Sequence, residues 1–178
     1  RYDPQKDHAS LFEALSIFSS KCHSFRLFLA GHNVTSFNHS LTALLNKFRL
    51  RSRVCLLGQI KNVPQLMQSL DIHVLSSSYG EAFPNVLAES MLCRTPCIAT
   101  DVGESSLIVG NTGWVTTPSA PDQLALALKL AYDEWKSQPN RWSERQNSSR
   151  SHILNNFSIT KMCSLYVKLW DDTIALNA

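Results

Sequence analysis

Short apolar runs of strand length alternate with segments of helical periodicity along nearly the whole chain. The predicted strands lie at residues 25–31, 54–58, 72–75, 97–100 and 113–116. The predicted helices lie at residues 8–18, 36–48, 64–70, 83–92, 105–109, 121–135, 140–155 and 159–176. This regular alternation predicts an α/β fold, because strands joined by crossover helices become parallel neighbours in one sheet. The handedness of such crossovers puts helices on both faces of that sheet.

Composition and charge narrow the classes of protein. The chain has 178 residues, the size of one domain, and we predict that residues 1–178 form a single domain. A hydrophobic fraction of 44% argues against disorder. The net charge of +3 is too weak a bias for a nucleic-acid surface, so no nucleic-acid partner is expected. The densest basic patch, Lys47, Arg49, Arg51 and Arg53, is typical of a solvated helix end.

Targeting signals and cysteines indicate the compartment. The polar start of the sequence carries no secretory signal, and no apolar run approaches the ~20 residues of a membrane-spanning helix. The 5 cysteines are irregularly spaced, which argues against a disulfide framework. Cys93 and Cys97 lack the two further ligands that a zinc site needs. We therefore expect a cytoplasmic protein with reduced, mostly buried thiols.

The segment 78–90, after the third predicted strand, holds the strongest candidates for a binding site. Ligands of parallel sheets bind beyond the carboxyl ends of the strands. Pro84 fits the first turn of a helix, where its missing N–H costs nothing. The free amides around Phe83, Asn85 and Val86 would then point out of the helix start, and together with the helix dipole they would form an anion site. A diphosphate is the natural occupant.

Two carboxylates flank this predicted anion site. Glu81 precedes the helix, and Glu89 lies one turn beyond Asn85 on the same side. Carboxylates suit vicinal diols because they accept two hydrogen bonds, so the pair could hold hydroxyls at both ends of a nucleotide-diphosphate sugar. On spacing alone, Glu81 could instead only complement the helix dipole, and Glu89 could be an ordinary surface residue. The apolar side chains predicted to face the core are Phe83, Val86, Leu87 and Met91.

Several motifs resemble one enzyme family. The run Tyr-Gly-Glu-Ala-Phe-Pro-Asn-Val-Leu-Ala-Glu-Ser-Met at 79–91 resembles the E-x7-E region of retaining glycosyltransferases of family 4, which have the GT-B fold. The segments 93–103 and 109–115 resemble its continuation, and Arg1 and Lys6 resemble its Arg and Lys, five positions apart. The resemblance covers nearly the whole chain. It implies a Rossmann-like three-layer domain, one half of a GT-B fold.

The resemblance also implies a role for each matching residue. Arg1 and Lys6 would bind the donor diphosphate and stabilise the charge of the leaving nucleotide, while Glu81 would hold hydroxyls of the donor sugar. Glu89 would hold the ribose hydroxyls. The other donor-binding positions are Phe83, Pro84, Asn85 and Val86 at the phosphate and sugar, and Gly58, Gln59 and Ile60 at the nucleobase. No metal or other cofactor is implied, because cationic side chains and helix amides take the place of a metal.

The implied function is donor binding in a retaining hexosyltransferase or N-acetylhexosaminyltransferase of polysaccharide or glycoconjugate biosynthesis. Its partners would be a nucleotide-diphosphate-sugar donor and an amino-terminal acceptor domain, without which the chain would transfer little or no sugar. Through that domain the enzyme could reach a lipid-linked acceptor or the inner face of the membrane. The alternatives are a GT-B-like nucleotide-sugar epimerase and a non-catalytic nucleotide-sugar-binding domain.

Two further implications concern the architecture. The family has a buried strand immediately before the position of Arg1, so a sheet without that strand would lack a central member and leave exposed strand edges. The carboxyl-terminal helix, at 156–178, usually crosses to the partner domain. Tyr166, Leu169 and Trp170 would then be exposed, whereas ordinary packing on the home domain would bury them.

Overall fold

The computed structural model describes residues 1–20, 22 and 24–176. The strands are β1 (Leu27–Ala30), β2 (Val54–Gly58), β3 (His73–Leu75), β4 (Cys97–Thr100) and β5 (Trp114–Thr116). The α-helices are α1 (His8–Ser19), α2 (His39–Lys47), α3 (Val63–Gln68), α4 (Asn85–Leu92), α5 (Ser105–Val109), α6 (Pro121–Ser137), α7 (Pro139–Asn156) and α8 (Ile159–Leu176). Short 3-10 helices are η1 (Pro4–Lys6), η2 (Arg51–Arg53) and η3 (Gly110–Thr112). Every predicted element is present, and the differences are confined to element ends.

Short polar side chains and prolines determine where the helices begin. The Asp7 carboxylate accepts a hydrogen bond from the amide of Ser10 and so caps α1. Asn38 caps α2 through the amide of Leu41, which explains why that helix begins at His39 rather than at the predicted residue 36. Pro121 and Pro139 occupy first-turn positions of α6 and α7, where a missing N–H leaves no hydrogen bond unmade.

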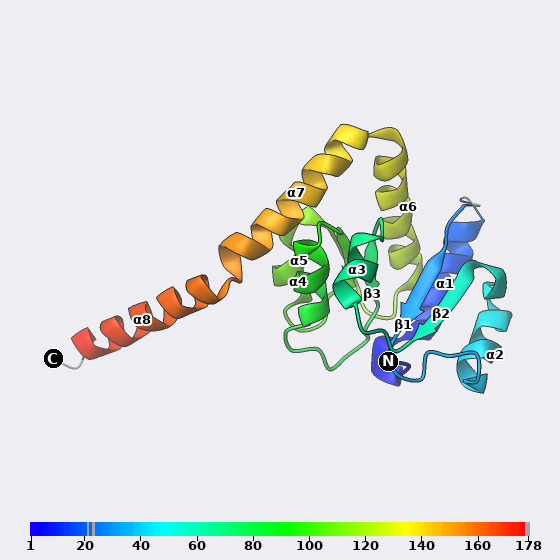
Figure 1. Ribbon diagram of the computed structural model, residues 1–178, viewed down its shortest axis with the longest axis horizontal. Coiled ribbons are helices and arrows are strands. Elements are labelled where there is room, and N and C mark those ends of the chain that lie inside the picture. The colour runs from blue at the N-terminus through cyan, green and yellow to red at the C-terminus, as the bar shows by residue number, and fades with distance from the viewer. Residues whose placement is uncertain (21, 23, 177–178) are drawn as a thin grey trace.

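The five strands are parallel but form two separate sheets. β1 pairs with β2, and β4 pairs with both β3 and β5. The parallel α/β class is therefore confirmed, whereas the expectation of one continuous sheet is corrected. The sheets face each other at β1 and β3, which do not pair, and the chain passes from the first sheet to the second through α3, between β2 and β3 (Figure 1).

Side chains of the central strand alternate between two hydrophobic cores. Ile98 of β4 lies in the core formed with α1, α2 and α6, whereas its neighbours Cys97 and Ala99 lie in the core formed with α4, α5 and α7. This is the period of two expected for a strand buried on both faces. Burial also raises the pKa of the Cys97 thiol to about 12, so this cysteine is a packing thiol, as predicted. Helices thus cover both faces of the β3–β4–β5 sheet.

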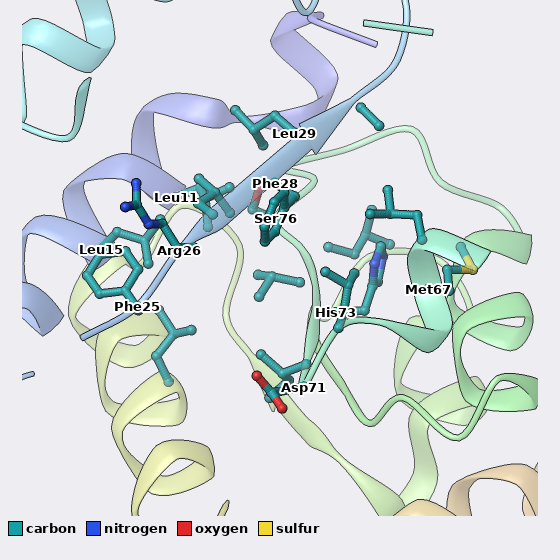
Figure 2. A pocket seen from close by; sticks show the side chains of 18 of the residues that line it. Leu11, Leu15, Phe25, Arg26, Phe28, Leu29, Met67, Asp71, His73 and Ser76 are labelled. Carbon is teal, nitrogen blue, oxygen red and sulfur yellow. The ribbon is translucent and has the colours of Figure 1, made fainter. Parts of the chain in front are cut away.

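A cavity of about 1110 Å³ occupies the space between β1 and β3. Leu29 of β1 lies on one side and His73 of β3 on the other, with Leu11 and Leu15 of α1 beside them (Figure 2). A strand of about six residues, with strands about 4.8 Å apart in a layer about 10 Å thick, fills on the order of 1000 Å³. The cavity therefore has about the size of one strand.

The carboxyl-terminal helix α8 extends away from the body of the domain (Figure 1). None of its described residues is buried, and the side chains of Tyr166, Leu169 and Trp170 are 53%, 58% and 61% exposed. The structure therefore does not show the alternative in which α8 packs on its home domain. Its crossing to another domain stays a prediction, and residues 177–178 of the predicted segment lie outside the described residues. No helix within the described ranges is long and apolar enough to cross a membrane.

A buried carboxylate links α6 to α7. Glu134, only 6% exposed, accepts hydrogen bonds from Nε and Nη2 of Arg145 at 2.6 and 2.8 Å. The Arg145 guanidinium also stacks on the ring of Trp114, 4.2 Å from its centroid. The hydrogen bonds from Arg145 lower the pKa of the Glu134 carboxyl below its ordinary value, against the opposing effect of burial.

This ion pair should make folding stability depend on pH in acid. Because the folded pKa of Glu134 is depressed, its contribution is complete above the unfolded-state pKa of about 4.3 and is lost as the pH falls through the folded value. We expect Glu134→Gln to lower the free energy of unfolding by about 1–3 kcal/mol at pH 7. Urea titrations at pH 7 and pH 3 would test this, because the two proteins should converge at the lower pH. An equal difference at both pH values would contradict the assignment.

Candidate functional site

The first six residues cross the carboxyl ends of β1 and β3. The amide of Tyr2 donates to the carbonyl of His32, just after β1, at 2.9 Å. At the other end, the amide of Ser78 donates to the carbonyl of Gln5 at 2.9 Å, and the Ser76 hydroxyl donates to that of Lys6 at 2.8 Å. The amino-terminal segment therefore lies at the edge where ligands of parallel sheets bind, beside the loop that follows β3.

A half-buried ion pair forms the centre of this edge. Nζ of Lys6 lies 2.5 Å from Oε1 of Glu81, and the hydroxyl of Ser77 donates to the same oxygen at 2.6 Å. The Lys6 and Glu81 side chains are only 26% and 12% exposed. Burial alone would raise the pKa of the Glu81 carboxyl, but the hydrogen bonds from Lys6 and Ser77, with the charges of Lys6 and Arg1, lower it below its ordinary value.

The ion pair leaves hydrogen-bonding capacity for a ligand. Both bonds to the Glu81 carboxylate go to Oε1, and among the described residues no hydrogen bond reaches Oε2. An ammonium has three N–H donors, of which Lys6 uses one on Glu81. The pair therefore offers two donors to an anion and a carboxylate oxygen to a hydroxyl, side by side.

Arg1 reaches the same loop through an intermediate residue. Its Nη2 donates to Oε1 of Gln5 at 2.8 Å, and Nε2 of Gln5 donates to the carbonyl of Gly80 at 2.7 Å. The Arg1 side chain is 58% exposed and also lies 3.4 Å from the carboxylate of Asp3. The structure thus places Arg1, Lys6 and Glu81 around one loop, and it leaves the Arg1 guanidinium accessible to a ligand.

The helix start predicted as an anion site is open to solvent. Pro84 is the N-cap of α4, and the amides of Asn85 and Val86 donate to no backbone carbonyl outside the helix among the described residues. Asn85 is exposed, whereas Leu87 and Met91 are fully buried, as predicted.

Phe83 differs from its prediction. Its side chain is 41% exposed, and its ring packs against Phe157, with centroids 5.6 Å apart, rather than in the core. The predicted helix start at residue 83 is two residues too early, so Phe83 lies before α4 and does not follow the periodicity of the helix. A side chain at the surface can still contact a donor, so the role of Phe83 in donor binding stays a prediction.

The loop that carries Glu81 rests on the loop that follows β4. The amide of Glu104 donates to the carbonyl of Ala82 at 2.9 Å. Gly103, at φ 57°, lies so close that a Cβ atom there would be 2.2 Å from the Glu81 carbonyl oxygen and 2.6 Å from that of Ala82. Only a glycine fits this contact, because it has no Cβ and adopts a positive φ freely.

The remaining predicted residues lie in two places: the nucleobase positions follow β2 at the same edge of the sheets, and Glu89 lies on α4. Gly58 ends β2 and accepts a hydrogen bond from the amide of Gly31 at 2.6 Å, and Gln59 and Ile60 follow it on the same edge. Gly31 in turn lies against the backbone of Arg1. Glu89 is exposed on α4, and among the described residues its side chain forms no hydrogen bond or ion pair, while its carbonyl accepts the Cys93 amide at the helix end. Its ribose role stays a prediction.

Sequence reasoning missed three residues that shape this site. They are Gln5, which ties Arg1 to Gly80; Ser77, which is fully buried beneath Glu81; and Gly103, which supports the loop. The sequence signal available for Ser77 was its place in a run of three serines at the carboxyl end of a predicted parallel strand, the edge where ligands of such sheets bind. Nothing near Gln5 in the sequence indicates its contact 75 residues away.

The sequence model described as glycosyl transferases group 1 matches residues 1–148. The chain belongs to this family. It is 28% identical over 133 residues to the phosphatidyl-myo-inositol mannosyltransferase of Mycobacterium tuberculosis, which covers 72% of this chain and 34% of that protein. It is 31% identical over 101 residues to a diphospho-undecaprenol-directed N-acetylgalactosaminyltransferase of Campylobacter jejuni, covering 57% of this chain and 26% of that protein.

A solved structure shows the same fold. Anabaena Alr3699/HepE, crystallised with UDP, superposes with a TM-score of 0.80 at 22% identity, over 97% of this chain and 47% of that one. The fold is therefore the Rossmann-like α/β domain found in GT-B glycosyltransferases. The chain spans about half the length of that protein and about a third or less of the curated relatives named above.

Proposed function

We propose that this chain binds the nucleotide-diphosphate-sugar donor of a retaining glycosyltransferase. The observation that carries the proposal is the Lys6–Glu81 pair, with Glu81 Oε2 open, next to the exposed start of α4. Cationic and amide donors suit a diphosphate, and a carboxylate oxygen suits sugar hydroxyls. Solved neighbours crystallised with UDP or UDP-glucose are consistent with such a donor.

Each group would act at a different part of the donor. Lys6 and Arg1 would bind the diphosphate and stabilise the negative charge that develops on it as the sugar–phosphate bond breaks. The amides of Asn85 and Val86 would bind the same anion, with Phe83 and Pro84 shaping the loop. Glu81 would hold sugar hydroxyls through Oε2 and keep Lys6 in place through Oε1. Neither step requires a metal, so we expect donor binding to persist in EDTA.

The ends of the donor would lie on either side of the diphosphate. Glu89, one helical turn into α4, would bind the ribose hydroxyls, and Gly58, Gln59 and Ile60 would border the nucleobase, mainly through backbone groups. The acceptor would be held by a second domain, so that this chain alone transfers little sugar. The names of the two curated relatives support a lipid-linked acceptor at a membrane surface.

The direct test is a thermal-unfolding screen of the chain against UDP-, GDP- and ADP-sugars. A ligand at 100 times its dissociation constant stabilises the native state by about 2.7 kcal/mol, a rise of roughly 5–11 °C for a chain of this size. We expect one base to raise the unfolding temperature at millimolar concentration, with or without EDTA. If no nucleotide sugar raises it, donor binding by this chain is rejected.

Glu81→Ala should separate sugar recognition from diphosphate recognition. The substitution removes the acceptor for sugar hydroxyls and releases Lys6, so affinity for the sugar nucleotide should fall about tenfold while affinity for the free nucleoside diphosphate stays level or rises. Isothermal titration with both ligands measures the two effects. Glu144→Ala, on the exposed surface of α7, is the matched control. Equal losses for both ligands would contradict the sugar-side role of Glu81.

A further inference from the structure

The charges of the chain are unevenly distributed. No Asp or Glu occurs between Glu13 and Asp71, although that stretch contains α2, η2 and both strands of the β1–β2 sheet. Five cations of this stretch gather where α2 ends and β2 begins. We call this group the basic edge; its members are Arg26, Lys47, Arg49, Arg51 and Arg53.

The cations of the basic edge are held in place and face solvent. Lys47, Arg49 and Arg51 are exposed, and none of the three forms an ion pair among the described residues. The Arg26 guanidinium donates to the carbonyl of Ser52 at 2.8 Å, which ties β1 to η2. Asp71 lies across the cavity from Arg26 without an ion pair between them (Figure 2). Within the part of the chain that the structure describes, no carboxylate therefore pairs with Arg26, Lys47, Arg49 or Arg51.

Two cations of the basic edge each form a cation–π contact with an aromatic ring. Nζ of Lys47 lies 5.1 Å from the centroid of the Phe48 ring, and the Arg53 guanidinium lies 4.9 Å from that of Phe25. Because these half-buried rings are covered by the cations of the same chain, they are not free to stack on nucleobases. The edge also consists of a helix end and a short turn, so no helix or ribbon protrudes that could enter a nucleic-acid groove.

We propose that the basic edge is a docking surface for a bilayer that contains anionic phospholipids. A planar array of phosphates fits solvent-exposed cations on a turn, and clusters of four to eight Lys or Arg are the usual size for such contacts. The edge lies at the amino end of β2, whereas the Lys6–Glu81 pair lies at the carboxyl ends of the strands. Bilayer docking and donor binding would therefore use opposite ends of the sheets and not compete.

The test measures co-sedimentation of the chain with vesicles in 0.15 M salt. Vesicles of phosphatidylcholine with 40% phosphatidylglycerol should bind it, and vesicles of phosphatidylcholine alone should not. Each cation near an anionic surface contributes about fivefold in affinity, so Arg49→Gln with Arg51→Gln should lower the partition coefficient about 25-fold. Raising the salt to 0.5 M should abolish binding, because screening shortens the range of the interaction.

The control is a second double variant with the same change in net charge. Lys129→Gln with Arg141→Gln removes two cations that pair with Asp133 and Glu134, away from the basic edge, and should leave vesicle binding within twofold. Equal loss in both double variants would overturn the proposal, as would failure to bind anionic vesicles. Binding to neutral vesicles would assign the contact to the apolar surface of α8 instead. Tighter binding to a DNA duplex at equal phosphate concentration would also reject a bilayer as the partner.

Discussion

Gly103→Ala is expected to lower the free energy of unfolding by about 3 kcal/mol or more, which corresponds to a fall of about 6–12 °C in unfolding temperature for a domain of this size. Two effects add. At φ 57° an alanine costs about 1–2 kcal/mol in backbone strain. In addition, its Cβ would lie 2.2 Å from the Glu81 carbonyl oxygen, so the loop that carries Glu81 must move.

Gly58→Ala separates the two effects. Gly58 has nearly the same backbone conformation, at φ 62°, but a Cβ there would meet only a methyl group of Thr35 at 3.7 Å, an ordinary contact. It should therefore show the strain alone, and the difference between the two variants should report the clash. Thermal unfolding of both proteins measures this difference. If they lose equal stability, the loop after β4 does not hold the Glu81 loop as tightly as the structure indicates.

The elements of the fold could be predicted because their signals are local. Cys97–Thr100 was predicted with its observed bounds, because a short apolar run between Pro96 and a polar loop is long enough for a strand but too short for a helix. The helix Ser105–Val109 likewise matched. Local signals failed where two neighbouring residues compete for a helix start. Asn38 rather than Ser36 caps α2, and the rigid Pro84 delays α4, which puts Phe83 outside the helix.

The arrangement of the elements was less accessible to sequence reasoning. An alternating pattern predicts parallel strands, but it does not say which strands pair, and β1 and β3 remain apart around a cavity. Of the predicted charged residues, the structure brings together Lys6, assigned from the resemblance, and Glu81, assigned from spacing and resemblance, and their role in donor binding stays a prediction. The supporting contacts of the site were not predicted, because Gln5 meets Gly80 across 75 residues and Gly103 acts through the absence of a side chain.

Lys6→Met should weaken the binding of UDP, or of whichever nucleoside diphosphate the chain prefers, about 10- to 100-fold. Methionine keeps an apolar stem of similar length but removes the ammonium that would bind the diphosphate, and hydrogen bonds to charged groups contribute about 1.5–3 kcal/mol each. The substitution also leaves the Glu81 carboxylate 12% exposed with one hydrogen bond, from Ser77. An unpaired carboxylate at that position would itself repel the diphosphate, which adds to the loss.

A second measurement distinguishes this role from a general loss of structure. Burial raises the pKa of the Glu81 carboxyl, and the hydrogen bond from Lys6 is the main interaction that lowers it. In Lys6→Met the Glu81 carboxyl should therefore titrate at a higher pH, which its carbon-13 chemical shift would show. The wild-type pair contributes stability above the unfolded-state pKa and loses it as the pH falls through the folded value, and the variant should lack this acid-dependent contribution. Lys129→Met removes an exposed partner of Asp133 and should change neither UDP affinity nor the Glu81 titration. Unchanged UDP affinity in folded Lys6→Met would show that the ion pair holds the loop but does not bind the donor.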